Sequence, residues 1–259
     1  MKQYPTYLQS LGLLLIVLLF ALLSALVILP FSSFNDPIGI LFIYAGSLTG
    51  AIVTALFIRR NFIFAVSKFQ WILCIYGSLT AISFELFVDP VTSLMPIPDS
   101  LKDMMANAYT HPISTFIMIA VLAPLLEELL FRGVVLDGFL KNYKPAHAIF
   151  ASALLFAFVH GNFAQGIGAF FIGLVIGWIY WKTNSVIPGI IIHFVNNGLA
   201  ASAIFFIDEK DIMKNLSEYF AEPWMYWNIV AMGGVVTFVS VWALSKMFPK
   251  ASEPLKMQI

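Results

Sequence analysis

One apolar stretch of the chain holds two adjacent glutamates, Glu127 and Glu128, and Arg132 follows four residues after the second. On an α-helix Glu128 and Arg132 share a face and can form an ion pair. Glu127 is rotated from Glu128 by about 100° and has no charged partner in its own helix. An unpaired carboxylate can accept a proton as a general base. The spacing therefore predicts one anchored carboxylate and one that is free for proton transfer.

Two later stretches add imidazole and amide groups. His160 ends one apolar run, and His193 and Asn197 lie four residues apart in another. Such groups on one helix face can bind a metal or donate hydrogen bonds to an oxyanion. Ionisable side chains at membrane depth are costly and mark candidate functional sites. The alternative is structural, since such groups also serve as interhelical hydrogen bonds. Glu85, alone on another stretch, is interpreted as structural or peripheral.

Apolar helices must position these side chains. The chain has 259 residues, of which 60% are hydrophobic and only 11% charged, and its mean hydropathy is +0.90. This composition excludes disordered, coiled-coil and ordinary soluble proteins. A membrane-spanning helix needs about 20 apolar residues, and the sequence predicts an all-α polytopic protein with about eight such helices. We expect them near residues 8–29, 37–58, 70–95, 113–140, 146–160, 164–181, 186–207 and 224–247.

The distribution of charge predicts the orientation of these helices. Most lysines and arginines precede the first helix or follow an even-numbered one, whereas most acidic residues lie on the other side. The positive-inside rule makes the first side cytoplasmic, so both termini are expected to be cytoplasmic, with the first helix retained. We expect a single transmembrane domain over 1–259, with a catalytic core at about 113–207. The formal net charge is zero, which argues against a nucleic-acid partner.

The predicted helices place the polar groups at similar depths. At 1.5 Å per residue, Glu127 and His160 lie about 21 and 22 Å from the cytoplasmic ends of their helices. His193 and Asn197 lie about 12 and 18 Å from theirs. The four side chains can therefore converge if their helices are neighbours. Pro124, one turn before Glu127, is expected to kink its helix and free backbone carbonyls near the site.

Three motifs carry a resemblance to a known family. Glu127-Glu128-x-x-x-Arg132, Phe156-x-x-x-His160 and His193-x-x-x-Asn197 resemble, in type and order, the motifs of the CaaX-protease and bacteriocin-processing (CPBP or Abi) family. That resemblance implies an intramembrane endopeptidase. The family includes type II CaaX prenyl endopeptidases, which remove three C-terminal residues from prenylated proteins, and bacterial members linked to bacteriocin maturation and self-immunity.

The resemblance also implies a role for each matched residue. Glu127 and His160 resemble the pair that activates water, and the His193-x-x-x-Asn197 motif resembles the oxyanion donors. Glu128 and Arg132 resemble the supporting ion pair. The expected substrate is a peptide or a membrane-associated protein, and the expected location is a bacterial cytoplasmic membrane.

A metal-dependent mechanism is the main alternative within the protease class. Glu127, His160 and His193 are plausible ligands for zinc or another divalent metal. The His-Glu-x-x-His signature of zinc proteases is absent from the sequence, so we expect no cofactor.

Other classes of function stay open. Leu136-Asp137-Gly138 resembles the aspartate motif of site-2 proteases, but those enzymes also need His-Glu-x-x-His, and no serine is placed as a rhomboid nucleophile. Intramembrane carboxylates and histidines could instead relay protons in a transporter, although paired inverted repeats are absent from the sequence. The third alternative is a catalytically inactive scaffold or immunity protein.

Overall fold

The structure, a computed structural model, describes residues 3–31, 37–212 and 214–248. These residues form helices and connecting segments, with an isolated β-bridge between Val66 and Ser185. Seven helices are long and apolar enough to cross a membrane. The protein is therefore an all-α, multi-pass membrane protein. The spanning helices are α1 (Tyr7–Ile28), α2 (Pro37–Arg59), α3 (Ile72–Thr92), the continuous run Pro112–Asn142, α9 (Phe163–Thr183), α10 (Ile187–Ser202) with the turn that follows it, and α11 (Pro223–Met247).

The fifth of the eight expected helices is short, as its predicted range of 146–160 indicates, and it ends two residues earlier than predicted. Helix α8 (Pro145–Phe158) has 14 residues, or about 21 Å at 1.5 Å per residue, against a hydrocarbon core of about 30 Å. It ends before Gly161, which has φ of +72°, a conformation that glycine adopts at little cost. His160 therefore lies in the turn after α8, not in the helix as expected.

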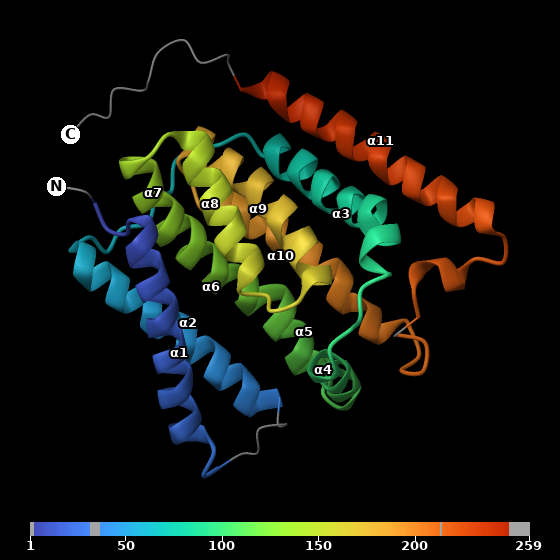
Figure 1. The fold of residues 1–259 in the computed structure, drawn as a ribbon, viewed down its shortest axis with the longest axis horizontal. Coiled ribbons are helices and arrows are strands. Elements are labelled where there is room, and N and C mark those ends of the chain that lie inside the picture. Colours follow the sequence, from blue (N-terminus) through green and yellow to red (C-terminus); the bar gives the residue numbers. More distant parts are fainter. Residues whose placement is uncertain (1–2, 32–36, 213, 249–259) are drawn as a thin grey trace.

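The helices are arranged in a central group with a pair on either side (Figure 1). Helices α6 (Ala123–Leu130), α8, α9 and α10 form the centre, where α8 packs along α9. Helix α1 packs on α2 at one side, and α11 packs on α3 at the other. The amphipathic helix α4 (Asp99–Thr110) precedes the central group. Side chains from α2 and α3 can therefore reach the central group from opposite sides.

The span that carries both glutamates alternates between α-helix and π-helix. Its central α-helix, α6 (Ala123–Leu130), lies between two π-helical segments. π-Helical turns are uncommon and occur frequently at functional sites. The pieces in order are α5 (Pro112–Phe116), η1 (Ile117–Leu122), α6, η2 (Phe131–Leu136) and α7 (Asp137–Asn142).

Pro124 explains a free carbonyl at the first π-helical segment. The N–H of Ala123 bonds to the carbonyl of Met118, five residues earlier. The next bond of this kind, to Ile119, cannot form because proline has no N–H. The Ile119 carbonyl instead accepts a hydrogen bond from the Asn197 side chain at 3.2 Å. The expectation that Pro124 frees a backbone carbonyl near the polar residues is confirmed.

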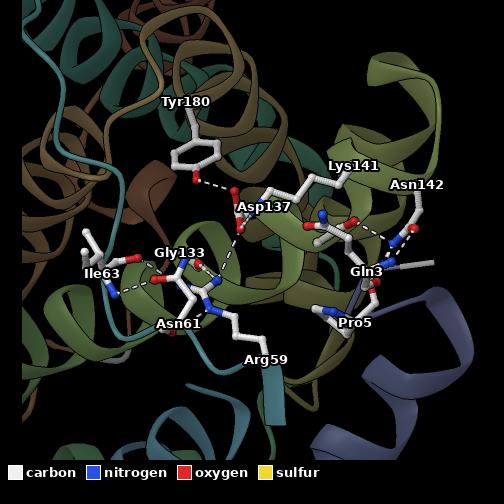
Figure 2. Close-up of polar contacts among 11 residues, drawn as sticks. Gln3, Pro5, Arg59, Asn61, Ile63, Gly133, Asp137, Lys141, Asn142 and Tyr180 are labelled. Atoms are coloured by element: carbon white, nitrogen blue, oxygen red, sulfur yellow. Dashed lines mark hydrogen bonds and ion pairs between the residues drawn. The ribbon is translucent and has the colours of Figure 1, made fainter. Parts of the chain in front are cut away.

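One end of the molecule is held by a polar network (Figure 2). Asp137 accepts hydrogen bonds from Arg59 at 3.2 Å and Lys141 at 2.7 Å. Arg59 also donates to the Gly133 carbonyl at 2.9 Å, and Asn142 donates to the Gln3 carbonyl at 2.6 Å. The N-terminal segment and the ends of α2 and α7 thus share one end of the molecule.

These contacts bear on two sequence expectations. They place Arg59 and Lys141 at one end, as the charge distribution predicted, while Lys2, Lys250 and Lys256 lie outside the described residues. The assignment of that end to the cytoplasm stays a prediction. Asp137 is neutralised by two cations there, which supports a structural role for it and argues against the site-2 protease interpretation.

Candidate functional site

Glu128 lies at the centre of a buried cluster. Its Oε1 is 2.7 Å from a terminal nitrogen of Arg132 and 3.0 Å from Nδ1 of His193. Glu128 and Arg132 are 0% and 1% exposed. The predicted ion pair is therefore present, and it extends across to α10. Removing one partner of a buried ion pair costs about 3–5 kcal/mol, because the other charge is left uncompensated.

Glu127 has partners that come from other helices. The Tyr44 hydroxyl of α2 donates a hydrogen bond to its Oε1. Its Oε2 lies 3.8 Å from Nε2 of His193, which is beyond hydrogen-bonding distance, and among the described residues it has no hydrogen-bond partner. The expectation of a wholly unpaired Glu127 is thus wrong for one oxygen. The other oxygen has an open acceptor position.

His193 connects the two glutamates. A carboxylate only accepts hydrogen bonds, so the Nδ1 that faces Glu128 carries a proton. Nε2 is then the ring atom that points toward Glu127. It can donate to an oxyanion only when the ring carries both protons. The residue is 3% exposed, so its orientation is set by packing as well as by these contacts.

His160 is positioned by the end of its own helix. Its Nδ1 lies 2.8 Å from the Phe156 carbonyl, which can only accept, so Nδ1 is protonated and Nε2 is the free acceptor. The Phe156 ring makes edge contacts with His160 and His193, at centroid distances of 4.9 and 5.7 Å. No hydrogen bond or ion pair in the described part of the chain joins His160 to Glu127. Glu127 approaches His193 directly, whereas His160 and His193 both contact the Phe156 ring.

Asn197 is engaged with the backbone of the first π-helical segment. Its amide nitrogen donates one hydrogen to the Ile119 carbonyl, and its second hydrogen remains for another acceptor. Asn196 makes a long contact of 3.5 Å to the Asn197 amide oxygen. The predicted oxyanion donor is therefore held in place by the carbonyl that Pro124 leaves free.

A cavity of about 480 Å³ opens beside these residues. His160, His193 and Asn197 line it, and much of the remaining wall is apolar. Its volume falls within the roughly 300–1,000 Å³ of pockets that bind small ligands. Glu127 and Glu128 are not among the lining residues, and both contact the wall through His193.

The alternative metal ligands do not form a coordination group. Among the residues that the structure describes, no three His, Cys, Asp or Glu side chains are arranged to hold a metal ion. Glu127 approaches His193, whereas His160 bonds to its own helix. The donor set of the metal alternative therefore does not fit as it stands.

Sequence reasoning missed two polar side chains near the cluster. Tyr44 bonds to a glutamate 83 residues away, and its only sequence signal is a hydroxyl within an apolar stretch. Glu85 was interpreted as structural or peripheral, but it lines the same cavity as His160 and His193. In the sequence Glu85 carried the same kind of signal as the other site residues, a polar group at membrane depth.

Comparison with known proteins identifies the segment that carries the motifs. Residues 109–199 match the family model described as type II CAAX prenyl endopeptidase Rce1-like, which confirms the predicted resemblance over that segment. A segment of 92 residues is 37% identical to UPF0177 protein YxdF of Lactococcus lactis subsp. lactis strain IL1403. The match covers 35% of this chain and half the length of that relative. No solved structure matches the chain.

Proposed function

We propose that this chain, whose residues 109–199 match the type II CAAX prenyl endopeptidase family, is an intramembrane peptidase. It hydrolyses a peptide bond of a membrane-associated protein in a bacterial cytoplasmic membrane. The observation that carries the proposal is the cluster in which His193 lies between Glu127 and Glu128 and borders a cavity. Tyr44 lies outside the matched segment, so residues from outside that segment also contribute to the site.

Hydrolysis of a peptide bond needs a base that accepts a proton from water and an acid that donates a proton to the leaving nitrogen. Oε2 of Glu127 is buried and has no hydrogen-bond partner among the described residues, so its acceptor position is open to a water molecule that enters the cluster. In our proposal Glu127 accepts the proton as the water oxygen attacks the carbonyl carbon, and then passes it to the amine that leaves. His160, with Nε2 free, assists in orienting the water.

The attacked carbonyl oxygen becomes an oxyanion that needs hydrogen-bond donors. The second amide hydrogen of Asn197 and Nε2 of a doubly protonated His193 are the proposed donors, and both residues line the cavity. Glu128 and Arg132 do not contact the substrate in this proposal. They fix the ring of His193, with Phe156 packed beneath the Arg132 guanidinium at 4.7 Å.

One observation favours a second candidate, an inactive membrane scaffold or immunity protein. Both proposed oxyanion donors already make contacts that a purely structural site would also contain, His193 to Glu128 and Asn197 to Ile119. In that case the motifs serve packing alone, and loss of Glu127 would change stability without changing any cleavage.

The test is a quantitative survey of new protein termini in host membranes that contain the wild type or Glu127→Gln at matched abundance. We expect new termini with the wild type that are absent with Glu127→Gln. Glu209→Gln, at an exposed position outside the spanning helices, is the matched control and should resemble the wild type. Identical termini for the wild type and Glu127→Gln, with both proteins folded, would favour the scaffold.

A further inference from the structure

Glu85 presents a carboxylate on the wall of the cavity. It projects from α3, on the side of the central group where α3 packs on α9. Its carboxylate lies against Gly168 of α9, where a Cβ atom would be 2.1 Å from Oε1 and 2.9 Å from Oε2. Because residue 168 has no side chain, the backbone of α9 leaves room for the Glu85 carboxylate. Any side chain at residue 168 would displace that carboxylate.

The charge of Glu85 has no counterpart in the described structure. Among the described residues it makes no hydrogen bond or ion pair, and no lysine or arginine lines the cavity. Every other carboxylate of the described spanning helices has a polar partner. These partners are Tyr226 for Asp89, Tyr44 for Glu127, Arg132 for Glu128, and Arg59 with Lys141 for Asp137.

An ionised carboxylate at membrane depth is costly without a partner, and such residues mark ligand or ion pathways. A cationic group that enters the cavity with a ligand would supply the missing partner through a charge-assisted hydrogen bond. The neighbouring wall residues Ile82, Leu86 and Ile172 are apolar. They suit the aliphatic stem of a lysine or arginine whose charged end reaches the carboxylate.

We propose that Glu85 is a specificity-determining residue that binds a lysine or arginine side chain of the substrate. His193 and Asn197 line the same cavity, so this cationic side chain lies close to the bond that is cleaved. The proposal rests on the proposed peptidase function and names the class of substrate for that site. Glu85 lies outside the matched segment of residues 109–199, so it selects substrates for this chain independently of the motifs.

The test measures peptide binding to the full chain in lipid nanodiscs on the Glu127→Gln background, where the proposed function expects no cleavage. A series of apolar peptides carries lysine, norleucine or glutamate at each position in turn. At one position we expect lysine to bind about tenfold more tightly than norleucine, as one charge-assisted hydrogen bond would give. Adding Glu85→Gln should reduce that ratio to about one, and adding Glu85→Lys should favour the glutamate peptide.

Asp89→Asn is the matched control, since Asp89 lies one turn further along α3 and bonds to Tyr226 at 2.9 Å. It should leave the lysine preference intact. Unchanged binding of the norleucine peptide to Glu85→Gln shows that the variant is folded. The proposal is overturned if lysine is not preferred at any position, or if the preference survives Glu85→Gln. Absence of cleavage by the wild type, with the preference present, would overturn the peptidase function alone.

Discussion

The two oxygens of the Glu127 carboxylate have different surroundings. Oε1 accepts the hydrogen bond of Tyr44, whereas Oε2 is unbonded and faces His193. In the proposed mechanism this difference directs proton transfer to Oε2. Tyr44 then acts as a positioning residue, because its hydroxyl fixes the rotation of the carboxylate without contacting the substrate.

Tyr44→Phe removes this hydroxyl and keeps the ring. A hydrogen bond to a charged group contributes about 1.5–3 kcal/mol, so we expect kcat to fall about ten- to hundredfold with little change in KM. Tyr226→Phe is the control, because it removes a tyrosine–carboxylate bond to Asp89 away from the cavity. It should lower the unfolding temperature and leave kcat unchanged. A wild-type kcat for Tyr44→Phe would exclude the positioning role.

The sequence predicted the contact within a helix and the general convergence of the polar groups, but it missed particular partners that come from other helices. The Glu128–Arg132 pair follows from a spacing of four residues, which any α-helix places on one face. Neither the Tyr44 bond nor the cavity position of Glu85 has such a local rule, since each depends on which helices are neighbours. For the same reason Glu127 was predicted to be unpaired.

At the scale of elements, hydropathy predicted the spans but not their internal irregularity. Seven of the eight expected helices are present as spans, because length and composition determine them. Each of the two π-helical segments has a backbone carbonyl that accepts a hydrogen bond from a side chain of another helix. Asn197 bonds to Ile119 in one, and Arg59 bonds to Gly133 in the other. Only the proline that frees the first carbonyl was visible in the sequence.

Helix α10 approaches α6 at a position that has no side chain. A Cβ atom at Gly189 would lie 2.8 Å from Oε2 of Glu128 and 2.7 Å from Cγ2 of Ile176. Contacts this short require the glutamate or the helix to move. The close approach brings His193, one turn later in α10, within bonding distance of Glu128.

Gly189→Ala should therefore disturb the cluster. We expect a loss of unfolding free energy of about 1–3 kcal/mol, the usual cost of overpacking, and a loss of cleavage that exceeds the fraction unfolded. Gly198→Ala on the same helix is the control, since the nearest atom to its Cβ would be Ala120 Cβ at 3.8 Å. Denaturant unfolding and the cleavage assay check both variants. Equal behaviour of the two variants would contradict the close-approach argument.

At the scale of the whole molecule, the two ends of the described chain lie together. Gln3 bonds to Asn142 at the end of α7. Tyr180 of α9 bonds to Asp137 at the start of α7. Phe248 packs on Trp178 of α9 at a centroid distance of 5.1 Å. Both ends of the described chain therefore lie at the same end of the helix bundle (Figure 1). From this arrangement we predict an even number of crossings, with the short helix α8 as the eighth beside the seven longer spans.

This argument predicts the outcome of cysteine labelling in intact cells. The sole natural cysteine, Cys74, is buried and gives a low background. We expect a membrane-impermeant maleimide to label Asp208→Cys, which is exposed after α10, and to label neither Gln3→Cys nor Lys246→Cys until the cells are opened. All three positions are exposed, so opened cells provide the control for reactivity. Labelling of Gln3→Cys and Lys246→Cys from opposite sides would show an odd number of crossings and remove α8 from the count. Labelling of both from outside would preserve the even count and reverse the orientation that the charge distribution predicts.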